Sequence, residues 1–227
     1  MIFKRILHKI NNEKAKLLQV KEENLVRKIV QKQSQPIYHI HIRKTAGTTI
    51  NFAFLSNAGV SNTEQFYESI AHKPNHRQIK SSKIFVGWNV KLIEQGEYSF
   101  AFSHTPRHQL NLKPEVFTFT CLRDPVKRVV SHYNMLKYYQ LNNIDHPIMK
   151  VEGKWLGKSF DDFMVRMPKE HLLNQLYMFS SSCDLNEATD SLLSLNKIIY
   201  TENLKVGLDE LEIKTGWQLP ISNQKKI

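Results

Sequence analysis

Short apolar runs alternate with segments of helical spacing along most of the chain. Apolar and β-branched residues cluster in runs typical of buried strands at residues 37–42, 98–103, 116–122 and 197–201. Helical spacing predicts helices at residues 50–55, 125–139, 171–179, 187–195 and 204–215, and Ser159 is a typical N-cap for one more. Strands separated by helices predict βαβ units. We therefore expect an α/β fold with a central, mostly parallel sheet and helices on both faces.

The first 33 residues show a different pattern. They predict one amphipathic helix over residues 2–33, because apolar residues recur at helical spacing from Phe3 to Ile10 and more loosely from Leu17 to Ile29. Pro36 ends this pattern, since proline disfavours helix at the residue before it. We therefore expect a basic helical arm at residues 1–35 and a domain at residues 36–227. The arm either contacts a membrane surface, pairs with a partner helix or packs on its own domain.

Composition narrows the classes of protein. The chain has 227 residues, 41% hydrophobic and 10% aromatic, which is enough for the core of one domain. Its net charge of +11 favours an anionic partner. Residues 1–35 carry +6, so the other 192 residues carry only +5, and nucleic acid is not expected as a partner. The two cysteines, Cys121 and Cys183, are too few for a disulfide framework and form no Cys-x-x-Cys zinc motif.

The most informative segment is His-Ile-His-Ile-Arg-Lys-Thr-Ala-Gly-Thr-Thr-Ile at residues 39–50. A strand leads into small residues and then a helix, so backbone N–H groups can converge on an anion that Lys44 also reaches. The segment therefore predicts a phosphate-binding turn. It is not a Walker A motif, because Tyr38 and Arg43 stand where that motif has glycine. One alternative is that the turn belongs to a nucleotide-dependent kinase with an atypical phosphate loop. A simpler interpretation is an ordinary strand–turn–helix with an exposed lysine that binds no phosphate.

A second basic segment follows the strand at residues 116–122. Arg123 comes directly after this strand, Asp124 and Pro125 turn the chain, and Ser131 lies two helical turns further on. Ligands collect at the carboxyl ends of parallel strands, so Arg123 and Ser131 can hold an anionic group together, the arginine through its planar fork. Taken alone, Arg-Asp-Pro is also a common turn with a surface arginine.

Together the two segments resemble the PAPS-dependent carbohydrate sulfotransferases, which include the heparan 2-O- and 6-O-sulfotransferases and bacterial relatives. Residues 41–49 resemble the family's 5′-phosphosulfate loop, and residues 122–133 resemble its 3′-phosphate motif with the same Arg-to-Ser spacing. Arg43 departs from the proline usual in the family. The resemblance implies a three-layer P-loop NTPase-like fold. It also implies transfer of a sulfuryl group from PAPS (3′-phosphoadenosine 5′-phosphosulfate) to a hydroxyl of a carbohydrate acceptor.

The resemblance also implies roles for individual residues. The residues expected to bind PAPS are Arg43, Lys44, Thr45, Ala46, Gly47, Thr48 and Thr49 at the 5′ end, and Arg123 and Ser131 at the 3′-phosphate. Lys44 would also stabilise the leaving phosphate, and no metal is required. We expect His104 to be the general base, because it follows a strand to the same sheet edge and imidazole titrates near neutral pH. His108 and His132 are the second choices.

The acceptor site leaves a weaker pattern. Its candidate contacts are His41, Arg107, His108, Asn174 and Gln175. The basic side chains of Lys113, Lys127, Arg128 and Lys137 either meet an anionic sugar polymer or form a solvated face.

Two further expectations come from what the sequence lacks. The start of the chain has no continuous apolar signal segment, and no stretch approaches 18 apolar residues. We therefore expect a bacterial cytoplasmic enzyme, with a Golgi enzyme stripped of its anchor as the alternative. A non-catalytic binder of anionic polymers, driven by the basic arm, is the second functional alternative.

Overall fold

The structure is a computed structural model that describes residues 2–32, 35–73 and 76–221, with the side chains of the first helix described from residue 11. Its centre is a six-stranded sheet in the order β2-β3-β4-β1-β5-β6. The strands are β1 (Ile37–Ile40), β2 (Gln78–Lys80), β3 (Lys83–Gly87), β4 (Phe100–Ser103), β5 (Phe117–Leu122) and β6 (Lys197–Tyr200). All neighbours are parallel except β2 and β3. This confirms the expected mostly parallel sheet.

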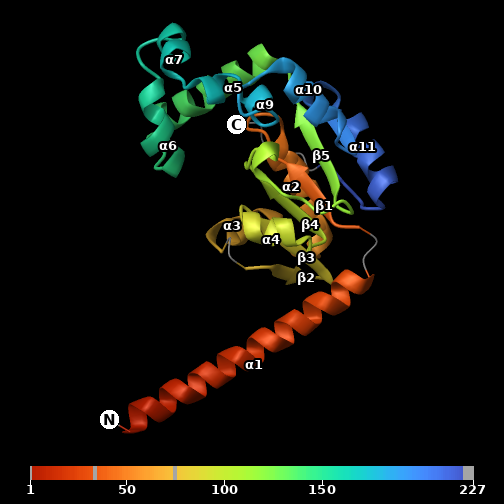
Figure 1. Ribbon diagram of the computed structural model, residues 1–227. Helices are drawn as coiled ribbons and strands as arrows, with labels where there is room; N and C mark the ends of the chain where they lie inside the picture. The colour runs from red at the N-terminus through yellow and green to blue at the C-terminus, as the bar shows by residue number, and fades with distance from the viewer. Residues whose placement is uncertain (1, 33–34, 74–75, 222–227) are drawn as a thin grey trace.

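Helices cover both faces of the sheet, which gives three layers (Figure 1). One face packs on α2 (Gly47–Leu55), α3 (Thr63–His72) and α11 (Leu204–Thr215). The other face packs on α4 (Val90–Gln95), α10 (Leu185–Leu193) and the C-terminal end of α1 (Ile2–Lys32). Alternate residues of one strand serve the two layers: Phe100 and Phe102 lie in the first apolar cluster and Ala101 in the second. The buried strands are apolar on both faces for this reason.

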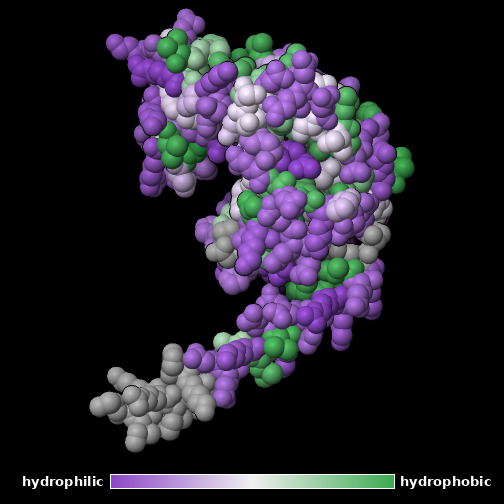
Figure 2. All heavy atoms as spheres, viewed as in Figure 1, coloured by the Kyte–Doolittle hydropathy of each residue, from purple (hydrophilic) through white to green (hydrophobic). Residues whose placement is uncertain are grey.

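A helical lobe rises beside the carboxyl edge of the sheet. It contains α5 (Pro125–Leu141), α6 (Pro147–Glu152) and α7 (Phe160–Arg166), which share an apolar cluster that includes Leu136, Trp155 and Phe163. Two short helices, α8 (Lys169–Leu172) and α9 (Asn174–Tyr177), lead from the lobe back to the sheet. Figure 2 shows the surface hollowed between the lobe, at the upper left, and the part of the body around α3.

Some sequence predictions of elements were wrong. The single helix expected at residues 171–179 is two short helices, α8 and α9, which break at Leu173. No pattern predicted β2, β3, α3, α4 or α6. The β2 strand is three residues long and half-exposed, too short to show a period of two.

The first helix is both packed and exposed. Val26 and Ile29 are buried in the second apolar cluster, whereas Leu17, Leu18 and Leu25 are 46–66% exposed. Figure 1 shows α1 leaving the body toward the N-terminus. The apolar spacing expected from the side chains of Phe3 to Ile10 lies outside the described side chains. Within the described ranges, no helix is both long and apolar enough to cross a membrane. Contact of the arm with a membrane or a partner helix stays a prediction.

The packing of α11 on β6 leads to a first prediction. A Cβ atom added at Gly207 would lie 2.7 Å from Cβ of Ile199 on β6. Gly207→Ala should lower the free energy of unfolding by about 1–2 kcal/mol, because overpacking outweighs the gain in helix propensity. Urea unfolding followed by circular dichroism measures this change. Val206→Ala is the matched control, since Val206 is 58% exposed on the same helix, and it should change stability little. Equal stability of the two variants would contradict the described packing.

Candidate functional site

Three strands deliver the candidate residues to one edge of the sheet. In the parallel register Ile40 of β1 lies opposite Ser103 of β4 and Thr120 of β5. The residues that follow these strands therefore leave the sheet side by side. The phosphate turn follows β1, His104 follows β4 and Arg123 follows β5.

The turn between β1 and α2 is tightly coiled. Lys44 and Ala46 both have left-handed backbones, with φ of 68° and 61°, and the hydroxyl of Thr45 donates to the carbonyl of Ile42 at 2.9 Å. Gly47 begins α2 against the ring of His41, where an added Cβ would fall 1.9 Å from a ring atom. Glycine is therefore required at this position for close approach to the histidine ring.

The start of α2 is open to an anion. Several other helices begin at side chains that accept a hydrogen bond from the first turn, namely Asn62, Asn89, Asp124, Ser159 and Asp184. The residue before α2 is Ala46, which has no such group. The first backbone N–H groups of a helix have no partner inside it, and they carry partial positive charge. The donor set at Gly47, Thr48 and Thr49 therefore fits a phosphate oxygen.

Arg123 and Lys44 bring the two basic segments together. The Arg123 guanidinium donates from Nη1 to the backbone carbonyl of Lys44 at 3.2 Å. Burial and the nearby charge of Arg123 lower the pKa of Lys44. An anion placed here would relieve this repulsion between like charges. Ser131 is half-buried on α5, one residue before the buried His132.

The side chain of Gln175 forms two hydrogen bonds with the backbone of Arg123. Its side-chain oxygen accepts from the Arg123 backbone N–H at 2.8 Å, and its amide nitrogen donates to the Arg123 carbonyl at 2.9 Å. Gln175 was expected as an acceptor contact, but its amide is used to position Arg123. The sequence could not show this link, because the two residues are 52 positions apart.

Three histidines form a histidine stack at the end of β1: His39, His41 and His104. Asn51 sets two tautomers, since its oxygen accepts from Nδ1 of His39 at 2.8 Å and its nitrogen donates to Nδ1 of His41 at 3.4 Å. Nδ1 of His104 donates to the carbonyl of His41 at 2.6 Å, so the neutral His104 ring keeps a lone pair on Nε2. Burial lowers the pKa of His104 to about 4 and that of His41 well below its usual value. Both rings are therefore neutral at pH 7.

A buried carboxylate links the phosphate turn to the helical lobe. Glu152 of α6 accepts from the Arg43 guanidinium with one oxygen and from Nε2 of His132 at 2.6 Å with the other. Burial alone would raise the pKa of Glu152, but the hydrogen bond from His132 and the charge of Arg43 hold it below its usual value. Arg43 was expected to bind the donor, and in the structure its guanidinium is paired with Glu152. His132, a second choice for the base, is buried against Trp155 and Phe163.

Arg128 is buried, which contradicts both alternatives given for it, an acceptor contact and a solvated face. It is 1% exposed, and Nη2 donates to the carbonyls of His171 and Leu172 at 2.7 Å each. Burial lowers its pKa to about 10, so the group still carries its charge at pH 7. Arg128 therefore fixes the end of α8 to α5.

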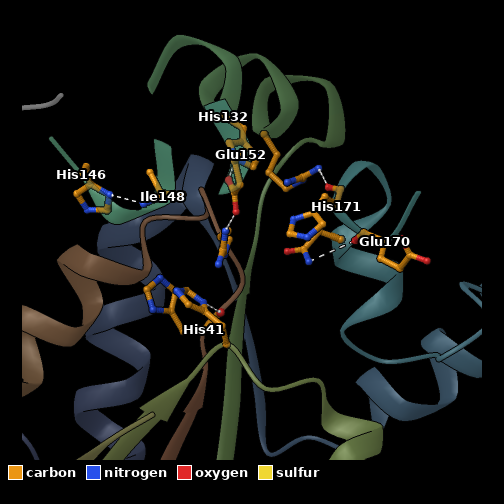
Figure 3. A network of polar contacts seen from close by, with 11 residues as sticks. His41, His132, His146, Ile148, Glu152, Glu170 and His171 are labelled. Atoms are coloured by element: carbon orange, nitrogen blue, oxygen red, sulfur yellow. Dashed lines mark hydrogen bonds and ion pairs between the residues drawn. The ribbon is translucent and has the colours of Figure 1, made fainter. Parts of the chain in front are cut away.

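A pocket of about 180 Å³ lies between the histidine stack and α8–α9. It is lined by His41, Arg43, His104, Pro106, Gln109, Glu170, His171, Asn174, Tyr177 and Met178. Figure 3 shows His41 below, Glu152 above, and His171 and Glu170 beside this space. His104 is thus one of the residues that line a pocket large enough for a small polar group.

The pocket brings together some of the expected acceptor contacts and not others. His41 and Asn174 line it, whereas Arg107 donates to the carbonyl of Leu110 and His108 packs edge-on against Tyr177. The sequence analysis missed four polar residues around the pocket, Gln109, Glu152, Glu170 and His171. No motif marked them. Glu152, Glu170 and His171 come to the pocket on α6 and α8, and Gln109 comes to it in the turn after β4.

Comparison with known proteins places part of the chain in a described family. Residues 27–180, about two thirds of the chain, match the family model described as "Sulfotransferase family". The matched range contains the phosphate turn, Arg123, Ser131 and every residue that lines the pocket. No curated protein matches the chain.

The Glu152 link leads to a second prediction. Glu152→Ala should lower the free energy of unfolding at pH 7 by about 3 kcal/mol, because Arg43 and His132 lose a buried partner. The wild-type advantage should be full above pH 4.5 and disappear as the pH falls through the lowered pKa of Glu152, where the wild-type carboxyl is protonated. Urea unfolding at several pH values measures both effects.

Glu210→Ala is the control for this prediction. Glu210 pairs with Lys197 at a half-exposed position, and such pairs contribute about 0–1 kcal/mol. If the two variants lose equal stability at pH 7, Glu152 does not link the phosphate turn to the lobe energetically.

Proposed function

The chain belongs to the sulfotransferase family, and from that premise we propose that it transfers a sulfuryl group from PAPS to a carbohydrate hydroxyl, with Lys44 and His104 as catalytic residues. The observation that carries the proposal is the meeting of two anion-binding segments at one sheet edge. Arg123 reaches the Lys44 carbonyl at 3.2 Å, and the uncapped start of α2 lies beside both. A donor with phosphates at two positions needs such a pair of sites.

The donor set fits PAPS residue by residue. Backbone N–H groups at Thr45–Thr49 and the Lys44 ammonium suit the 5′ end, where the phosphate and sulfate oxygens are all acceptors. Arg123 and Ser131 suit the 3′-phosphate, with Gln175 holding the arginine backbone in place. Arg43, neutralised by Glu152, would border the sulfate rather than bind it as a free cation. The bound donor supplies the activated sulfuryl group.

We assign separate roles in the transfer reaction to His104, Lys44 and His41. Nε2 of His104 takes the proton of the acceptor hydroxyl as its oxygen forms a bond to sulfur. The bond from sulfur to the 5′-phosphate oxygen breaks, and the electron pair stays on that oxygen. The positive charge of Lys44 stabilises this developing negative charge. Burial and the charge of Arg123 lower the pKa of Lys44, and a bound anion would favour its charged form. The His41 carbonyl keeps the His104 ring in the tautomer that can accept a proton.

Nucleotide binding provides the third prediction. The product 3′-phosphoadenosine 5′-phosphate at one hundred times its dissociation constant should stabilise the protein by about 2.7 kcal/mol and raise Tm by about 5–10 °C. AMP and ATP–Mg²⁺ should raise Tm much less. Lys44→Ala should weaken binding of all adenine nucleotides. Arg123→Ala should remove the preference for the 3′-phosphorylated nucleotide, because it removes the group that reads that phosphate.

A control variant and two other thermal-shift results test the proposal further. Lys150→Ala, at an exposed position, should bind like the wild type. Equal or larger shifts with ATP–Mg²⁺ would favour the kinase alternative. No shift with any nucleotide would favour a binder of anionic polymers.

His104 provides the fourth prediction. His104→Ala should keep nucleotide binding and lower kcat by about 100-fold or more, the usual contribution of a general base. In the wild type, activity should be flat from pH 8 to pH 5 and fall as the pH drops through about 4, where the ring becomes protonated. His72→Ala, at the exposed end of α3, is the control and should retain full activity. Near-normal turnover of His104→Ala would show that His104 is not the general base.

A further inference from the structure

The wall of the pocket offers no free positive charge to an acceptor. Among the described residues that line it, Arg43 carries the one permanent positive charge and Glu170 the one negative charge. The Arg43 guanidinium is already paired with the buried Glu152. Lys44 and Arg123 lie at the phosphate turn, where the donor brings phosphate and sulfate charges of its own. A carboxylate or sulfate on the acceptor would therefore enter a pocket whose one cation is already neutralised.

The histidines of the pocket do not supply the missing charge. Burial lowers the pKa of His41, His104 and His171, and the charge of Arg43 adds to this in each case. These rings are neutral at pH 7, so they interact with an acceptor through single N–H groups or lone pairs. An anionic acceptor would also meet the negative charge of Glu170, an exposed residue of the pocket lining, and like charges repel.

Lone pairs are plentiful on the same wall. The side-chain oxygen of Asn174 is buried without a hydrogen-bond partner in the described structure, while its nitrogen donates to the Glu170 carbonyl at 3.4 Å. A buried acceptor left unpaired costs about 1–3 kcal/mol, which a donor from the substrate would recover. The neutral ring of His104, which also lines the pocket, adds a further lone pair on Nε2. These groups match hydroxyl groups, which donate.

The rest of the lining is Gln109 and the largely apolar side chains of Pro106, Tyr177 and Met178. A pyranose ring presents C–H groups on its faces and hydroxyls on its edge, so apolar side chains together with lone-pair acceptors suit it.

We propose that the acceptor is an uncharged sugar unit and that Glu170 and Asn174 select it against acidic sugars. The inference rests on the proposed sulfotransferase function and deepens it, because it names the class of acceptor for the same pocket. Asn174 accepts a hydrogen bond from a second hydroxyl of the sugar, next to the one that reacts. Glu170 accepts another and repels carboxylates and sulfates. Both are specificity-determining residues, and neither takes part in the transfer of the proton.

The test compares acceptors that differ in charge and little else. The full-length protein is supplied with PAPS, and release of 3′-phosphoadenosine 5′-phosphate is measured with oligogalacturonides, their methyl esters, and neutral galactose and glucose oligomers of the same length. The methyl ester removes the charge and keeps the ring and its hydroxyls. We expect turnover with neutral oligomers and at least a tenfold higher kcat/KM for the ester than for the free acid. Equal or faster use of the free acid, or no turnover with any neutral acceptor, would overturn the proposal.

Charge reversal tests the role of Glu170 directly. Glu170→Lys should raise kcat/KM for the free acid relative to the ester at least tenfold, and Glu170→Gln should give a smaller change in the same direction. Asp190→Lys makes the same charge change at an exposed position on α10 and should leave the ratio unaltered. Asn174→Ala should raise KM for neutral acceptors more than it lowers kcat. An unchanged acid-to-ester ratio in Glu170→Lys would remove Glu170 from the proposal.

Nucleotide binding separates the two levels of failure. If 3′-phosphoadenosine 5′-phosphate stabilises the protein but no neutral acceptor is used, the acceptor class is wrong and the donor assignment stands. If that nucleotide gives no stabilisation, the proposed sulfotransferase function itself fails.

Discussion

Arg43, Lys44 and Arg123 lie close together at one edge of the sheet, and the repulsion between their positive charges costs free energy. Other residues of the site reduce this repulsion. Burial, and next to it the charge of Arg123, lower the pKa of Lys44. The protein compensates in two ways. Glu152 neutralises Arg43, and the Lys44 carbonyl accepts from Arg123. Two positive groups thus remain for an anionic donor, while the third is committed to the structure.

This compensation joins the helical lobe to the sheet. Glu152 lies on α6 and reaches the phosphate turn, and Arg128 of α5 holds the carbonyls at the end of α8. Gln175 of α9 then holds the backbone of Arg123. The helices α8 and α9 therefore contribute to the pocket wall, and Glu152 of the lobe also positions Arg43 of the same pocket. A change in the packing of the lobe would be felt at both proposed substrate sites.

Burial explains two properties of the site at once. It lowers the pKa of His41, His104 and His171, so these rings are neutral at pH 7 and Nε2 of His104 carries a free lone pair. The same neutral rings leave the pocket without positive charge for an acidic acceptor. A more exposed histidine would be partly protonated near pH 6.5, so it would be a better partner for anions.

The sequence by itself determined the parts that depend on local order. The apolar runs predicted four of the strands and the parallel α/β class, because a buried strand needs apolar residues on both faces. The phosphate turn and the Arg-to-Ser segment were legible, because an anion cradle needs small residues, a helix start and basic groups at short spacing. Only the tertiary structure decided the rest. Glu152 meets Arg43 across 109 positions, and Arg128 looked like a surface arginine until its partners 43 and 44 positions away were known. Whether a charge faces solvent, a ligand or another charge depends on neighbours brought together by folding, which no local pattern records.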